Sequence, residues 1–164
     1  MLRRITSTLL ACIALLGCGF DPLYGQRGEQ KVINQFAYLR VAKIKDRVGQ
    51  QFRNELLHQL HSAGKSKQER YKLVASLEES SNSLAVRKSA FATRANLTVT
   101  AKYSLLSSEF SEPLLASSAN ATVSYNIYTS EFATLIARRE AQERAIKALS
   151  KDIVIRLAIF FESQ

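Results

Sequence analysis

ANLTVTAKYSLL (95–106) and LASSANATVSYNIY (115–128) are the two segments that decide the fold of this chain. In both segments apolar residues alternate with polar ones, which is the pattern of a β-strand with one buried face. The short polar segment 109–113 (EFSEP) separates them, so we predict an antiparallel hairpin. The residues predicted to face inward are Leu97, Val99, Ala101, Tyr103 and Leu105, then Ala119, Ala121, Val123, Tyr125 and Ile127.

Two more strands are predicted before the hairpin. Residues 69–78 (ERYKLVASLE) alternate, and the polar run 79–83 (ESSNS) that follows is predicted to bulge or fray. Residues 84–86 are compatible with a continuation of this strand. Residues 36–44 (FAYLRVAKI) carry apolar side chains on both faces, which is typical of a strand covered on both sides.

Two amphipathic helices are predicted. The first runs from Asp46, a suitable N-cap, to about His61, because Val48, Phe52, Leu56 and Leu60 recur at intervals of four. The second runs from Ser130 to about Phe161, a segment without Gly or Pro. Its predicted apolar stripe is Leu135, Ile146, Leu149, Ile153, Leu157 and Phe161, with Ala141, Ala145 and Ala148 allowing close approach.

The predicted order is therefore strand, helix, three strands and a long helix. This order favours the α+β class, with a four-stranded, mostly antiparallel sheet packed against two amphipathic helices. Residues 36–164 are predicted to form this single α/β domain. The last three strands are expected to be antiparallel neighbours, and the first strand can join either edge of the sheet.

The N-terminus resembles a bacterial lipoprotein signal. Arg3 and Arg4 precede twelve uncharged residues, too few for the roughly 20 needed to span a bilayer. The run ends in LLGC (15–18), so we predict that residues 1–17 are cleaved and that Cys18 is acylated. Gly19, where Asp would favour retention at the inner membrane, favours outer-membrane delivery. The alternatives are an ordinary signal peptide with an incidental cysteine, or a short buried helix.

Residues 18–35 are predicted to be a lipidated tether, since Pro22, Gly25 and Gly28 interrupt regular structure. Without residues 1–17 the 164-residue chain keeps 147 residues, and 21 basic residues face 14 acidic ones. This charge favours an anionic partner, and export argues against nucleic acid.

Neither a metal site nor a catalytic site is expected. The two cysteines are Cys12, in the leader, and Cys18, so the mature domain has no disulfide and no Cys/His zinc site. His58 and His61 lie three apart on the predicted helix and are interpreted as surface or packing residues. No Gly-rich phosphate loop, Gly-x-Ser-x-Gly or His-Glu-x-x-His motif is present, so we expect no enzyme and no cofactor beyond the covalent lipid on Cys18.

A basic turn is the candidate binding site. Arg87, Lys88 and Arg94 flank Phe91 between two predicted strands. Guanidinium groups pair with phosphates, and an aromatic ring can meet an acyl chain, so this group suits an anionic amphiphile. The alternative is that the charges are solvated and Phe91 folds back onto the sheet.

The segment CGFDPLYG (18–25) is very similar to the segment after the lipid cysteine in the alphaproteobacterial form of the LptE family. This resemblance implies a four-stranded sheet with two helices. It also implies a lipid anchor on the periplasmic side of the outer membrane, where LptE-like proteins plug the β-barrel protein LptD, assist its assembly and bind lipopolysaccharide during its insertion into the outer leaflet. At residue level only Cys18 carries over. The rival interpretation is a lipoprotein subunit of an ABC-type lipid-transport system.

Overall fold

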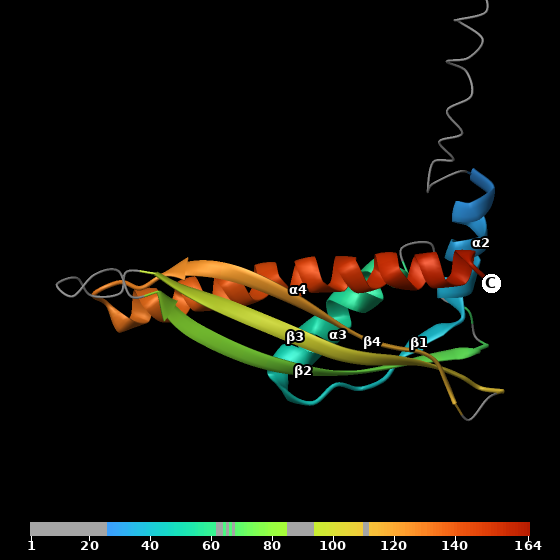
Figure 1. The fold of residues 1–164 in the computed structure, drawn as a ribbon, viewed down its shortest axis with the longest axis horizontal. Coiled ribbons are helices and arrows are strands. Elements are labelled where there is room, and N and C mark those ends of the chain that lie inside the picture. Colours follow the sequence, from blue (N-terminus) through green and yellow to red (C-terminus); the bar gives the residue numbers. More distant parts are fainter. Residues whose placement is uncertain (1–25, 62–63, 65, 67, 85–93, 110–111) are drawn as a thin grey trace, which may run out of the picture. The chain divides into compact units, whose positions relative to one another are not determined.

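The computed structural model describes residues 26–61, 64, 66, 68–84, 94–109 and 112–164 (Figure 1). The chain divides into two units, residues 1–30 and residues 31–164, and the sheet belongs to the second. The elements follow in the order α2 (Gln26–Ala37), β1 (Leu39–Val41), α3 (Asp46–Leu60), β2 (Tyr71–Leu84), β3 (Arg94–Ser107), β4 (Pro113–Asn126) and α4 (Glu131–Glu162).

The four strands form one sheet in the order β1-β2-β3-β4. β1 is parallel to β2, because α3 carries the chain back between them, and the other neighbours are antiparallel. The α+β class and the mostly antiparallel sheet are confirmed, and the structure places the first strand at the β2 edge. It also contains a third helix, α2, which the sequence did not predict.

The N-terminal prediction needs correction. Residues 26–37 form α2 in place of the last part of the irregular tether, and the strand predicted over residues 36–44 is confined to Leu39–Val41. A helix brings Val32 and Phe36 onto one side, where both pack on the core. The Phe36 ring meets the Phe161 ring edge-on, with centroids 6.0 Å apart. Burial of this aromatic pair therefore favours the helix over an extended chain.

The predicted bulge at residues 79–83 is also wrong, because β2 stays in register with β3 from Tyr71 to Leu84. The polar side chains that this places on the inner face find partners there. Glu79 Oε1 accepts a hydrogen bond from Gln142 Nε2 at 2.6 Å, and the Ser81 and Tyr125 hydroxyls lie 2.9 Å apart. These bonds link the exposed far end of β2 to α4 and to β4.

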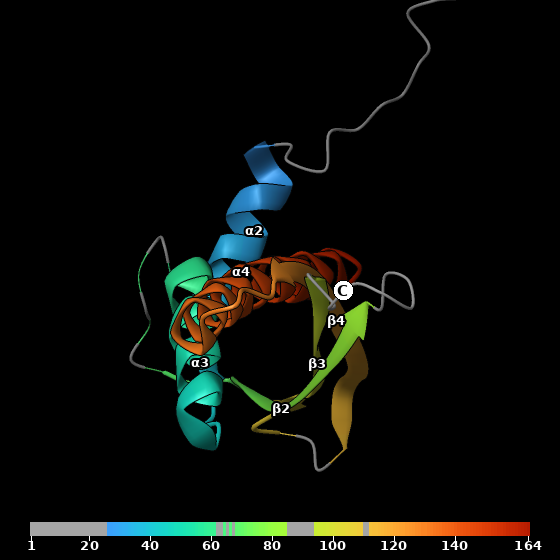
Figure 2. The same cartoon turned by 90° about the vertical axis from the view of Figure 1, so that its left-hand side faces the viewer.

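The helices cover one face of the sheet, α4 lying along β3 and β4 and α3 beside α4 (Figure 2). All five inward residues predicted on β3 are buried, and so is the α4 stripe from Ile146 to Phe161. Leu135 and Ala148, predicted for the same core-facing side, are exposed. Leu135 lies in the second turn of α4, well before the buried stripe that begins at Ala141, and its side chain is 44% exposed.

The N-cap of α3 also differs from the prediction. Lys45 is the cap residue and makes no side-chain capping bond. Asp46 is the first residue of the helix and takes a φ of 66°. Aspartate tolerates this left-handed conformation better than most residues, which allows the chain to turn sharply into α3.

Candidate functional site

The structure describes one of the four predicted site residues. Cys18, Arg87 and Lys88, together with Phe91, lie outside the described residues. Arg94 is the first residue of β3, is exposed and pairs with Asn126 of β4. The chain passes from Asn126 through Tyr128 into α4, so the start of this helix lies at the same end of the sheet as Arg94 (Figure 1).

Four large apolar side chains are exposed where α4 begins. Phe132 is 73% exposed, Tyr128 50%, Leu135 44% and Ile136 36%. Phe132 and Ile136 share one side of the helix, because they are four residues apart, and Leu135 adjoins them. These four residues are called the helix-start patch.

A local hydrogen-bond network holds the helix-start patch in place. Ser130 Oγ accepts a hydrogen bond from the Ala133 N–H at 3.4 Å and caps the helix. Thr134 Oγ1 accepts from the Tyr128 N–H at 2.9 Å and lies 3.2 Å from the carbonyl oxygens of both Tyr128 and Ser130. The chain therefore enters α4 in a defined direction, and the apolar side chains point outward from an ordered turn.

Cationic side chains adjoin this patch. Arg138 and Arg139 follow Ile136 on α4 and are exposed, and Arg94 contributes a third guanidinium from β3. Arginine binds phosphate through paired N–H donors, while the apolar patch offers a surface for hydrocarbon. The side chains at this end of the domain therefore have the chemistry that suits an anionic amphiphile, the ligand class predicted for the basic turn. Leu135 was predicted to belong to the core-facing stripe, but the sequence leaves about three helical turns between it and Ile146, the next large apolar residue of that stripe.

The second candidate surface is the uncovered face of the sheet. Among the described residues no helix packs on this side, which carries the even-numbered side chains of β2 and β3 and their partners on β4 (Figure 2). The name outer sheet face is kept for the central part of this side, which comprises Ser76, Glu78, Ser80, Asn82, Asn96, Thr98, Thr100, Lys102, Ser104, Ala116, Ser118, Asn120, Thr122 and Ser124. Lys72 and Val74 precede it on β2, and Arg94 lies beyond it at the start of β3.

The outer sheet face is polar but almost uncharged. The Thr98 and Thr122 hydroxyls lie 2.9 Å apart, and the Ser124 hydroxyl donates to Asn96 Oδ1 at 2.7 Å. Within the outer sheet face, Lys102 and Glu78 are the charged residues, and they pair with each other at 2.8 Å. β4 carries no charged residue over its 14 residues. Since the chain as a whole is 23% charged, its charges are concentrated elsewhere.

The histidines do not form a metal site in the described part of the chain. His61 Nε2 lies 3.0 Å from the Leu39 carbonyl oxygen, which makes His61 a packing residue, and His58 is exposed. No three potential ligands among His, Cys, Asp and Glu gather within the described ranges. None of the described helices has the length and apolarity that crossing a bilayer requires.

Three solved structures share this fold. A candidate lipoprotein from Caulobacter crescentus has a TM-score of 0.67 at 20% identity, over 82% of this chain and 98% of the other. Rare lipoprotein B from Shewanella oneidensis has a TM-score of 0.57 at 9% identity, over 74% and 92%. A minor lipoprotein from Acinetobacter baumannii has a TM-score of 0.56 at 12% identity, over 75% and 92%.

At these identities the similarity concerns the fold alone, and no curated protein matches the chain significantly. The family model for LptE, described as lipopolysaccharide-assembly, matches residues 33–157, which cover the sheet, α3 and most of α4. The chain belongs to the LptE lipopolysaccharide-assembly family.

Proposed function

We propose that this chain is an outer-membrane lipoprotein that plugs an LptD-like β-barrel, assists its assembly and takes part in the insertion of lipopolysaccharide into the outer leaflet. The observation that supports this most directly is the outer sheet face. It is a broad surface of hydroxyl and amide side chains with one internally paired ion pair.

Such a surface suits the interior of a membrane β-barrel, which is polar. Burying unpaired charges against a barrel wall would carry a large desolvation cost, and the outer sheet face avoids it. Its small side chains also let the backbone of a second protein approach closely. The hydroxyl and amide groups can then form hydrogen bonds to that protein in place of those they form with each other. The rest of the positive charge remains available for a ligand.

That ligand is lipopolysaccharide in this proposal. Its phosphates match the guanidinium groups of Arg94, Arg138 and Arg139, and its acyl chains match the helix-start patch. Arg87 and Lys88 precede Arg94 in the β2–β3 connection, and the proposal assigns them to the same binding site. Binding, transfer and assembly need no bond to be made or broken, so no enzymatic step and no metal is part of the proposal.

The lipid anchor on Cys18 is a separate part of the proposal. Each buried methylene of an acyl chain contributes about 0.8 kcal/mol, so more than one chain holds a protein stably at a bilayer. Mass spectrometry of the mature N-terminus tests this part. An acylated Cys18 as first residue supports it, whereas an unmodified Cys18 or a retained leader contradicts it.

Purification from detergent-solubilised outer membranes tests the barrel partner. We expect a stable complex with a large outer-membrane β-barrel. Thr98→Glu with Thr122→Glu places two unpaired charges on the outer sheet face and should reduce the recovered barrel, while Ala148→Glu on the exposed side of α4 should not. Recovery of inner-membrane transporter components in place of a barrel would support the ABC-type alternative and contradict the proposal.

A further inference from the structure

β2 has an open edge beyond its short pairing with β1. β1 pairs with β2 only at Tyr71, Lys72 and Leu73, and the Ala42 N–H then donates to the Leu73 carbonyl oxygen at 2.8 Å. β2 continues for eleven more residues to Leu84. Among the described residues no other strand pairs with this side of β2, and in Figure 1 the strand extends past the start of α3.

The direction of the backbone groups on this edge follows from the register. The Leu73 carbonyl points to β1, and backbone groups in a strand alternate in direction. β2 has no bulge against β3, so the N–H and C=O groups of Ala75, Leu77, Glu79, Ser81 and Ser83 all point away from β3. Over residues 74–84 β2 therefore presents a continuous row of donors and acceptors, and this part of the strand contains no Pro, Lys or bulge of the kind that often protects an edge strand.

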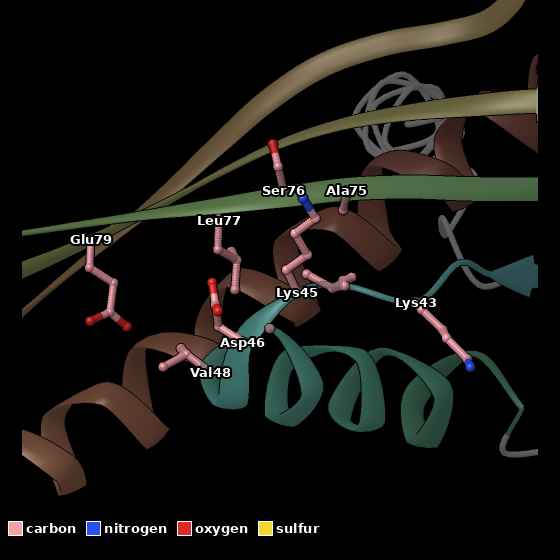
Figure 3. Close-up of a pocket in the computed structure, with 10 residues that line it drawn as sticks. Lys43, Lys45, Asp46, Val48, Ala75, Ser76, Leu77 and Glu79 are labelled. Carbon is pink, nitrogen blue, oxygen red and sulfur yellow. The ribbon is translucent and has the colours of Figure 1, made fainter.

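A pocket of about 640 Å³ lies where β1 leaves this edge (Figure 3). One wall is the β2 edge from Ala75 to Glu79, and the other is the segment 43–49 that leads into α3. Ile44, Val48 and Leu77 supply apolar lining, and Lys45 extends toward β2 near Ser76. Lys43 extends away from the strand (Figure 3). Neither lysine has an ion pair or hydrogen bond among the described residues.

We infer that this edge and pocket bind an extended segment of a partner protein by β-strand addition. The partner segment lies along residues 75–83 of β2. One of its ends enters the pocket and carries an acidic residue that pairs with Lys45. The middle of the segment is neutral or basic. Only another extended backbone can complete a row of alternating N–H and C=O groups, and the apolar lining takes alternate side chains.

Charge repulsion also disfavours a second copy of this chain as the segment that pairs with the β2 edge. Antiparallel pairing of two copies over residues 75–83 would be centred on residue 79, which places Glu79 of one copy opposite Glu79 of the other. Parallel pairing in register would place each glutamate opposite its own copy. Like charges directly opposite each other destabilise a strand pair. A partner segment with a basic residue opposite Glu79 is favoured, because opposite charges across a strand pair attract each other.

The probe is a synthetic nine-residue peptide of alternating Val and Thr, with Lys at its middle and Asp at its C-terminal end, suited to the more stable antiparallel pairing. It is titrated into the full chain in detergent solution, and amide hydrogen exchange is followed residue by residue. At saturation we expect exchange at Leu77, Glu79 and Ser81 to slow by about tenfold. Exchange at Ser76, Glu78 and Ser80, whose N–H groups face β3, should change little.

Two controls separate strand addition from binding through side chains. A peptide with alternate backbone nitrogens methylated should bind about tenfold more weakly, because it lacks several of the new hydrogen bonds. Lys45→Glu should weaken binding of the first peptide by about fivefold, and the matched variant Lys43→Glu by less than about twofold.

Three results would overturn the inference. They are absence of the alternating protection at saturation, equal binding of the methylated peptide, and a dimer of this chain that protects the same amides without peptide. The inference stands independently of the barrel proposal, because the peptide experiment contains no barrel protein.

Discussion

Phe36 and Phe161 join the end of α2 to the end of α4, their ring centroids 6.0 Å apart and their planes inclined at 76°. Phe161 also meets Tyr71 edge-on at 5.0 Å, so one side chain links α2, β2 and α4. Phe36 is 7% exposed and Phe161 3%. This aromatic cluster closes the end of the core opposite to the helix-start patch.

Phe161→Ala should therefore lower the free energy of unfolding by about 3–5 kcal/mol, because the substitution removes buried apolar area and leaves a cavity. The measurement is urea denaturation followed by circular dichroism. Phe132→Ala is the matched control, since Phe132 lies on the same helix but is 73% exposed, and it should change stability by less than about 0.5 kcal/mol. Equal effects of the two variants would contradict this description of the core.

Gly49 of α3 is predicted to be intolerant of a side chain. A Cβ at this buried position would lie 2.5 Å from Ile44 Cγ2 and 3.2 Å from Ile44 Cβ. Overpacking of this kind costs about 1–3 kcal/mol, which exceeds the gain of about 1 kcal/mol that alanine brings to a helix. Gly49→Ala should therefore destabilise the protein.

A double-mutant cycle with Ile44→Ala checks the cause. The two substitutions together should cost less than the sum of their separate effects, because removal of the Ile44 side-chain methyls relieves the clash. Additive effects would show that the close approach to Ile44 is not what excludes alanine at residue 49.

Ser150 should be replaceable by alanine without loss of stability. Its side chain is 0% exposed, and its hydroxyl has no hydrogen-bond partner among the described residues. An unpaired buried hydroxyl costs about 1–3 kcal/mol, and alanine favours the helix. Ser150→Ala should raise the melting temperature, and a lower melting temperature would indicate a partner for this hydroxyl in the folded protein.

The helix-start patch should contribute to lipopolysaccharide binding through apolar contact. Phe132→Ser with Ile136→Ser should weaken binding to lipopolysaccharide micelles by about tenfold or more, since each buried large apolar side chain is worth about 1.5–3 kcal/mol. Ile159→Ser is the control, because Ile159 is also exposed but lies near the other end of α4. An equal loss of lipopolysaccharide affinity in the Ile159→Ser control would show that binding depends on exposed apolar surface in general and not on the helix-start patch.

The basic residues should contribute through charge. Charge reversal of Arg87 and Lys88, or of Arg94, should weaken lipopolysaccharide binding and make it less sensitive to salt, because fewer ion pairs remain to be screened. The circular dichroism spectrum should stay unchanged. If none of the three charge reversals changes lipopolysaccharide binding, these basic residues are not part of the binding site.

The local patterns of the sequence were sufficient for much of the fold. Strict alternation over residues 95–106 and 115–128 determined the hairpin and its buried face, because the two-residue period of a strand leaves one choice of inward side chains. The spacing of Phe52, Leu56 and Leu60 determined α3 in the same way. The candidate site was partly accessible too, since the basic turn and Arg94 were visible as a charged interruption between strands.

Other features depended on contacts between distant residues, and only the tertiary structure decided them. α2 was missed because Phe36 is buried by Phe161, 125 positions later in the chain. The unbroken pairing of β2 with β3 was missed too, and there Gln142 and Tyr125 hydrogen-bond to the inward polar side chains Glu79 and Ser81. The exposure of Leu135 and the open edge of β2 depend on where α3 begins and where β1 ends. Hydrophobic periodicity identifies which face of an element is apolar, but how far that face is covered depends on the lengths and positions of its neighbours.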